Sequence, residues 1–333
     1  GQPRLLRLVE LMRLRRFPRW PSRNLWVWLG ALALASSTAA AVDAAGVAAL
    51  PPKTQQVVFL GDSITYSGGY VRDVAAYFAT RHPGHRLSFL NLGLPSETVS
   101  GLSEEGHAGG KFPRPDLHER LTRVLTQSKP DLVFACYGMN DGIYLPLAED
   151  RFAKFRDGMQ RLHHQVTATG ARLIHVTPAP YDELKGGRAG YAPVLDRYSE
   201  WLLDQRGGAR WEVVDAHFPM QQALEAGRRE NPNFFFARDG IHPNDAGHWQ
   251  IAREILRYLG ARDIAGLPDA AAMMATHPRG SDILKLVTTQ QTLLKDAWLG
   301  ATKHTRPGMK AGLPLTEAKA QSAQIQRKID GLR

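Results

Sequence analysis

Short apolar runs alternate with longer amphipathic stretches along the chain from residue 56 onward. The short runs are rich in β-branched and aromatic residues, and they predict strands at 57–61, 87–91, 132–137, 173–177 and 212–215. The longer stretches repeat apolar residues every three or four positions, and they predict helices at 71–81, 116–128, 152–169, 195–205 and 246–259. The strand runs contain few polar residues, as expected where both faces of a parallel sheet are covered. The pattern therefore predicts an α/β fold, a three-layer α/β/α sandwich around a five-stranded parallel sheet.

The pattern changes after Gly266. Apolar residues at helical spacing predict two amphipathic helices, near 283–298 and 318–332, separated by a Gly- and Pro-rich link at 307–314. Residues 266–333 are too few to be counted on for a core of their own, so we expect a helical extension that packs on the main domain. Assembly into an oligomer is an alternative role for these helices, and the oligomeric state stays open. The sequence assigns no role to residues 303–307, which could reach a functional site or lie elsewhere on the surface.

The first 42 residues have the layout of a secretory signal peptide. An Arg-rich lead is followed by an uncharged, mostly apolar run at 25–35 and by three alanines at 39–41. The apolar run falls within the ~7–15 residues of a signal-peptide core and short of the ~20 that span a bilayer. We expect residues 1–42 to be a leader cleaved near Ala41, residues 43–54 to be a linker, and the protein to be exported to the periplasm or the extracellular space. An uncleaved N-terminal membrane anchor is the alternative; once the leader is removed, we expect no stable membrane association.

Net charge and cysteine content narrow the classes of function. The net charge of +10 would suit a partner such as nucleic acid, but residues 1–42 carry seven arginines and one acid. The other 291 residues carry only +4, so nucleic-acid binding is not expected. A single cysteine, Cys136, excludes an intramolecular disulfide and a Cys-based zinc site. The twelve histidines do not cluster in the sequence and indicate no metal site.

Candidate chemistry gathers where the predicted strands end. Ser63 follows the first strand, Gly93 the second and Asn140 the third, while Asp239 and His242 come just before the last helix of the domain. Functional groups of parallel sheets collect at the carboxyl ends of the strands. The loop at 95–114, which follows Gly93, should therefore border the same cleft.

This set of residues suits acyl transfer. A serine hydroxyl becomes a useful nucleophile when an imidazole removes its proton and a carboxylate orients the imidazole, roles that Ser63, His242 and Asp239 can fill. The oxyanion of the intermediate needs preorganised donors, for which we expect the N–H groups of Ser63 and Gly93 and the side-chain amide of Asn140. Gly93 suits that role because it has no Cβ to obstruct a ligand.

Four sequence blocks carry a family resemblance. They are Gly61-Asp62-Ser63, Asn91-Leu92-Gly93, Gly138-Met139-Asn140-Asp141 and Asp239-Gly240-Ile241-His242-Pro243. Each alone is equally typical of a helix cap or a turn. Together, and in this order over residues 57–259, they resemble the SGNH (GDSL-like) hydrolase superfamily. The resemblance implies a flavodoxin-like sandwich over about residues 55–265 and a serine esterase with the roles above and without metal or other cofactor. The GxSxG elbow of other lipases is not met, because Thr65 stands where its second glycine would be.

The substrate is less constrained than the reaction. The predicted export disfavours cytoplasmic thioesters, and the loops around the site lack the long apolar stretch that a fatty-acyl tunnel needs. The sequences of residues 137–141 and 239–244 resemble the corresponding motifs of bacterial polysaccharide-deacetylating esterases. We therefore predict hydrolysis of O-acyl, chiefly O-acetyl, esters of an extracellular or envelope carbohydrate, with Asp62, Glu97 and Tyr144 contacting the substrate. The alternatives are a lipase or arylesterase of short-chain esters and a non-catalytic glycan-binding protein; the glycan, the acyl chain length and the regiospecificity stay open.

Overall fold

Five parallel strands form one sheet in the order β2-β1-β3-β4-β5. The computed structural model describes residue 50 and residues 53–333, so the predicted leader and most of the predicted linker lie outside the described residues. The strands are β1 Gln56–Gly61, β2 Ser88–Asn91, β3 Leu132–Cys136, β4 Arg172–Val176 and β5 Glu212–Val214. This is the flavodoxin-like strand order. The predicted α/β class and five-stranded parallel sheet are confirmed.

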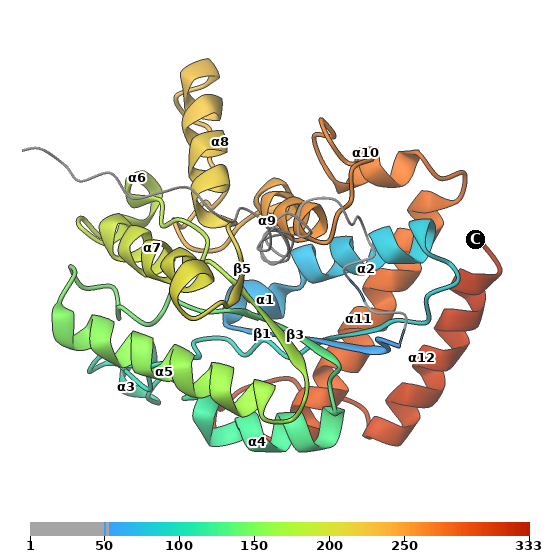
Figure 1. Ribbon diagram of the computed structural model, residues 1–333, viewed down its shortest axis with the longest axis horizontal. Helices are drawn as coiled ribbons and strands as arrows, with labels where there is room; N and C mark the ends of the chain where they lie inside the picture. Colours follow the sequence, from blue (N-terminus) through green and yellow to red (C-terminus); the bar gives the residue numbers. More distant parts are fainter. Residues whose placement is uncertain (1–49, 51–52) are drawn as a thin grey trace, which may run out of the picture. The chain divides into compact units, whose positions relative to one another are not determined.

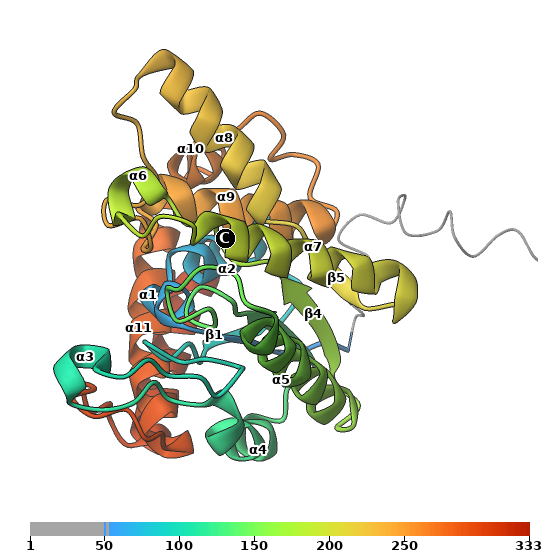
Figure 2. The same ribbon diagram turned by 90° about the vertical axis from the view of Figure 1, so that its left-hand side faces the viewer.

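Helices cover both faces of the sheet. Helices α2 and α9 pack together on one face, and α4 and α5 lie on the other (Figures 1 and 2). The helices of the main domain are α1 Ser63–Ser67, α2 Gly69–Arg81, α3 His107–Gly110, α4 Leu117–Ser128, α5 Glu149–Thr167, α6 Glu183–Gly186, α7 Ala192–Gly208, α8 His217–Glu230 and α9 Asp245–Tyr258. Helix α8 was not predicted from the sequence, and its buried stripe consists of only three side chains. That narrow stripe gives a weak periodic signal.

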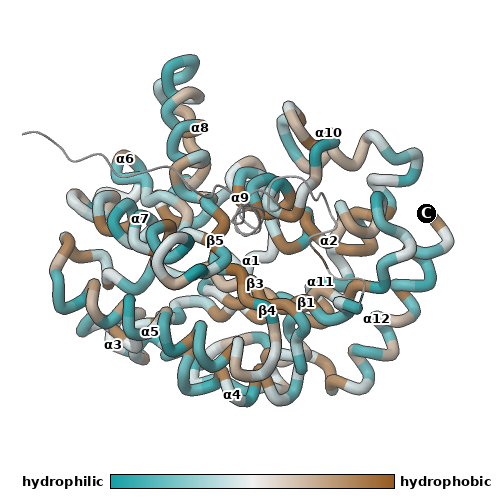
Figure 3. Tube along the Cα trace, in the orientation of Figure 1, coloured by the Kyte–Doolittle hydropathy of each residue, from teal (hydrophilic) through white to brown (hydrophobic). Residues whose placement is uncertain are grey.

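The central strands are buried because of this covering. All side chains from Val57 to Leu60 have no exposed surface, and Phe59 stacks on Phe134 of the neighbouring strand with ring centroids 4.9 Å apart. Figure 3 shows hydrophobic residues along β1, β3 and β4 and hydrophilic ones on the outer helices. Burial on both faces explains why these strands read as apolar runs rather than as an alternating pattern.

The C-terminal region packs against one edge of the sheet. It contains α10 Ala270–Ala275, α11 Gly280–Thr302 and α12 Leu315–Asp330. Helix α11 lies against α2, β2 and α12 (Figure 1). The Gln291 side chain donates a hydrogen bond to the carbonyl of Phe89 at 2.9 Å. Strand β2 is an edge strand, so this contact occupies a backbone acceptor that has no neighbouring strand.

Membrane-spanning helices are not found in the part of the chain that the structure describes. None of the helices between residues 53 and 333 combines the length and the apolar character that crossing a bilayer demands.

Candidate active site

Ser63 stands at the junction between the first strand and the first helix. Strand β1 ends at Gly61, and Asp62 then caps α1 by accepting the backbone N–H of Ile64 at 2.9 Å. The helix ends at Ser67 and is capped by Gly68, whose φ of 87° favours glycine. Ser63 therefore has the first helical position, where its own N–H has no preceding carbonyl to bind. Both the hydroxyl and this N–H are presented at the carboxyl edge of the sheet.

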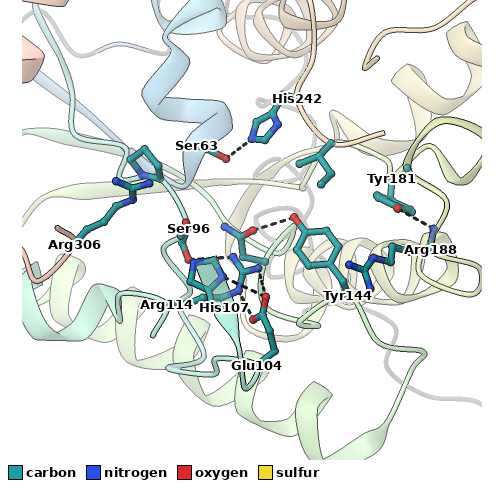
Figure 4. Close-up of a pocket in the computed structure, with 14 residues that line it drawn as sticks. Ser63, Ser96, Glu104, His107, Arg114, Tyr144, Tyr181, Arg188, His242 and Arg306 are labelled. Carbon is teal, nitrogen blue, oxygen red and sulfur yellow. Dashed lines mark hydrogen bonds and ion pairs between the residues drawn. The ribbon is translucent and has the colours of Figure 1, made fainter. Parts of the chain in front are cut away.

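Ser63, His242 and Asp239 form one hydrogen-bonded chain. Ser63 Oγ lies 2.8 Å from Nε2 of His242, and Nδ1 of the same ring lies 2.6 Å from Oδ2 of Asp239 (Figure 4 shows the first contact). Serine and histidine are 179 positions apart in the sequence. The structure thus brings together three residues that the sequence analysis placed in two separate loops.

A tight turn holds the acid–histidine pair. Oδ1 of Asp239 accepts the backbone N–H groups of Ile241 at 3.0 Å and His242 at 2.8 Å. Partial burial would raise the pKa of Asp239, but the hydrogen bonds from the His242 ring and from these two N–H groups outweigh it and lower the pKa below its ordinary value. Asp239 is therefore ionised near neutral pH and can fix the orientation of the imidazole. The turn requires Gly240, because with its φ of 78° a Cβ would lie 2.5 Å from the backbone nitrogen of Gly186.

Asn140 directs an amide toward the same cleft. Its Oδ1 accepts the hydroxyl of Tyr144 at 3.1 Å, and its Nδ2 donates to the carbonyl of Glu97 at 3.1 Å. The amide group has two N–H donors, so one is left for a ligand. Asn140 and Ser63 both line the cleft.

The contacts of Gly93 differ from those expected of an oxyanion donor. Its N–H donates to Oδ1 of Asn91 at 3.0 Å, and Gly93 is not among the residues that line the cleft. The glycine is required here for another reason: a Cβ would lie 2.4 Å from the backbone nitrogen of Tyr66 and 2.8 Å from the carbonyl carbon of Thr65. The close approach is to helix α1, not to a ligand, so the predicted oxyanion contact of Gly93 is not supported.

Two of the three predicted substrate contacts are buried. Glu97 has no exposed surface and pairs with Arg120, and Asp62 is 3% exposed and caps α1. A side chain with no exposed surface cannot touch a substrate, so the prediction is wrong for Glu97, and the structure gives Asp62 a capping role in its place. Tyr144, in contrast, lines the cleft and carries its hydroxyl on Asn140.

Several residues of the cleft were not singled out from the sequence. The cleft has a volume of about 480 Å³ and is bordered, as expected, by the loop at 95–114. Three other lining side chains come from segments distant in sequence (Figure 4): Tyr181, Arg188 and Arg306. No motif marks these positions, because they reach the cleft only through packing.

Metal ligation has no candidate within residues 53–333. There, no group of three or more His, Cys, Asp or Glu side chains is arranged to hold an ion.

One family of sequences covers the residues that form the sheet and the site. Residues 59–250, more than half of the chain, match the sequence profile of the GDSL-like Lipase/Acylhydrolase family, and the chain belongs to this family. The comparison with curated proteins gave no match.

Two solved structures are among those to which the chain is similar. The acetylxylan esterase from Geobacillus stearothermophilus aligns with 21% identity and a TM-score of 0.49, over 62% of this chain and 95% of that one. A gut microbial diltiazem-metabolizing enzyme aligns with 21% identity and a TM-score of 0.49, over 65% of this chain and 49% of that one. This chain therefore spans about half the length of the second enzyme.

Proposed function

We propose that the protein is a serine esterase that removes O-acyl groups, chiefly O-acetyl groups, from a carbohydrate through an acyl-enzyme. The observation that carries the proposal is the chain from Ser63 Oγ to His242 Nε2 (2.8 Å) and from His242 Nδ1 to Asp239 Oδ2 (2.6 Å). It opens onto the cleft of about 480 Å³ that Ser63 and Asn140 both line.

The geometry supports a two-step reaction. Ser63 Oγ attacks the acyl carbonyl carbon while His242 Nε2 takes the hydroxyl proton, and the Asp239 carboxylate stabilises the resulting imidazolium. The negative charge on the carbonyl oxygen is met by the N–H of Ser63 and the free N–H of the Asn140 amide. His242 then returns the proton to the departing sugar oxygen. In the second step water, deprotonated by His242, attacks the acyl-enzyme, releases the acid and regenerates Ser63.

The walls of the cleft favour a polar substrate with a small acyl group. Tyr144 and Tyr181 present aromatic rings, and Glu104, Arg114 and His107 place charged or polar groups around them. Aromatic rings with nearby polar groups suit sugars, whereas a long acyl chain needs an apolar channel. Export to the periplasm or the extracellular space, proposed from the leader, would bring the enzyme to acetylated polysaccharides.

The test is release of acetate by the wild type and by Ser63→Ala. Acetylated xylan, pectin, peptidoglycan and sialic acid are compared with p-nitrophenyl acetate and a long-chain ester. We expect acetate from at least one carbohydrate and a loss of about 10³-fold or more in Ser63→Ala, whose thermal unfolding should match that of the wild type. Activity confined to the aryl or long-chain ester would replace the proposal by a lipase or arylesterase. Binding of a glycan with no turnover of any ester would indicate a binding protein.

A further inference from the structure

One residue of the catalytic cleft comes from the C-terminal extension. Arg306, in the segment between α11 and α12, lines the cleft together with Ser63 and His242. Its guanidinium lies over the ring of Phe112, 5.2 Å from the ring centroid. Phe112 belongs to the loop at 95–114, so the extension and this loop meet at the rim of the cleft. The segment that the sequence left without a role therefore forms part of the site.

The main chain around Arg306 is anchored on both sides. Before it, the carbonyl of Thr302 accepts a hydrogen bond from Arg123 Nε of helix α4 at 2.8 Å. After it, Gly312 lies against the backbone of α11, where a Cβ would come within 2.2 Å of the carbonyl carbon of Asp296. Arg306 is thus held at the rim of the cleft by contacts on both sides of it.

The charge of Arg306 has no acidic partner among the described residues. Its Nη1 donates to the carbonyl of Pro307 at 3.1 Å, whereas its Nε is buried without any hydrogen-bond acceptor. A buried donor of a charged group that lacks an acceptor is costly. The Nη2 of Arg306 has no hydrogen-bond partner within residues 53–333 and is not buried, so an anion bound in the cleft can pair with that side of the guanidinium.

Arg188 provides a second unpaired cation in the same cleft. Its backbone N–H donates to the Tyr181 hydroxyl at 3.1 Å, and within residues 53–333 its guanidinium makes no ion pair. Arg114, by contrast, is neutralised by Glu104 through two contacts of 2.6 Å. Figure 4 shows Arg306 and Arg188 on opposite sides of the site, with Ser63 between them. Once the Arg114–Glu104 pair is set aside, the lining of the cleft carries two positive charges that are unpaired in the described part of the chain, those of Arg306 and Arg188.

We propose that the esterase acts on an O-acylated polyanionic glycan, whose anionic groups bind Arg306 and Arg188 on either side of the ester. This inference rests on the proposed function and names its substrate class. A guanidinium pairs with carboxylate, sulfate or phosphate oxygens through two parallel N–H bonds, which gives direction as well as attraction. Two such contacts would place a polymer across Ser63 so that an acyl group on an intervening sugar faces the hydroxyl.

The test compares two polymers with the same sugar backbone, one with free and one with esterified carboxyl groups. O-acetylated polygalacturonate is one, and the same polymer with its carboxyl groups methyl-esterified is the other; acetate release gives kcat/KM for each. We expect the wild type to prefer the acidic polymer by about tenfold or more. Arg188→Gln and Arg306→Gln should each lower this preference by about fivefold, because each removes one charged contact of about 1 kcal/mol or more. The ratio within one variant cancels any general loss of activity.

The control is Arg229→Gln on helix α8, an exposed arginine outside the cleft, which should leave the preference unchanged. A measurement on the wild type alone adds a second test. Rising NaCl concentration should lower kcat/KM for the acidic polymer and should leave kcat/KM for the neutral polymer unchanged. Acetylated glycans bearing sulfate or phosphate, assayed in parallel, distinguish which anion is preferred.

Equal rates on both polymers, with no effect of salt, would overturn the inference while Ser63-dependent acetate release kept the proposed function intact. Loss of all Ser63-dependent acetate release would instead overturn the proposed function.

Discussion

Glu97 and Arg120 form a bidentate ion pair in the interior, directly beneath the loops of the active site. Arg120 Nε lies 2.6 Å from Oε1 of Glu97, and Nη2 lies 2.7 Å from Oε2. Nη2 also donates to the carbonyl of Leu92, and the Tyr137 hydroxyl donates to Oε2, both at 2.7 Å. The backbone carbonyl of Glu97 accepts the amide of Asn140. The pair therefore joins the loop after β2 to Asn140, whose side chain lines the cleft.

Breaking this pair should cost much of the stability of the protein. Glu97→Gln leaves the Arg120 charge buried without its counterion, so we expect the free energy of unfolding to fall by about 3–5 kcal/mol. The matched control is Glu119→Gln, which breaks an exposed pair with Arg123 on helix α4 and should cost less than about 1 kcal/mol. Urea unfolding measures both. Equal losses in the two variants would show that the buried pair has no special role.

Asn140→Ala tests the amide as an oxyanion donor. Because the hydrogen bond to the oxyanion forms only in the transition state, we expect kcat to fall by about 10²–10³-fold with KM little changed. Tyr144→Phe removes only the hydroxyl that orients this amide and should have a smaller effect on kcat. Steady-state kinetics with p-nitrophenyl acetate, together with thermal unfolding as a check of folding, measure both. A rise in KM at constant kcat would contradict a role in the transition state.

Asp62→Asn should change how stability depends on pH. Burial raises the pKa of Asp62 from 3.8 to about 7, despite the hydrogen bond from Ile64 N–H, which lowers it. Between about pH 4 and pH 7 the folded state therefore holds a proton that the unfolded state has released, so the wild type loses stability as pH rises through this window, by up to ~1.4 kcal/mol per pH unit. The variant cannot ionise there, and its amide oxygen can still accept the Ile64 N–H.

The stability of Asp62→Asn relative to the wild type should accordingly rise from pH 4 to pH 7 and then level off. Asp73, whose pKa burial raises to about 6, is present in both proteins and cancels in the difference. The negative charge of Asp141 contributes to the raised pKa of Asp62, so its interaction with Asp62 is part of the measured difference. Urea unfolding at four pH values measures the effect. A difference that stays constant over this range would show that Asp62 is not protonated in the folded protein.

Gln291→Ala tests the contact of the C-terminal extension with the edge of the sheet. The substitution removes the donor to the Phe89 carbonyl, and we expect unfolding free energy to fall by about 1 kcal/mol. Gln324→Ala, at an exposed position of α12, is the control and should have no measurable cost. Should both variants unfold at the same urea concentration, the extension would not depend on this hydrogen bond.

Local patterns in the sequence determined the main features of the fold. The apolar runs at 57–61 and 132–137 specify strands because a strand buried on both faces needs no polar alternation. Asp62 predicts the start of a helix, because its carboxylate can cap backbone N–H groups within two residues. The sequence likewise predicted that Ser63, Asn140, Asp239 and His242 lie at one edge of the sheet. They follow strands or precede a helix, and parallel strands bring their carboxyl ends to one edge.

Tertiary structure alone decided which groups line the cleft. Glu97 and Gly93 lie in loops next to the site, and nothing local shows that one pairs with Arg120 or that the other packs on α1. Arg306 is more than 240 positions from Ser63 in sequence, yet both line one cleft because α11 packs along α2 and returns the chain there. Periodicity and capping depend on residues a few positions apart, and the sequence displays them. Burial, pairing of charges and the composition of a cleft depend on contacts between distant segments, which exist only after packing.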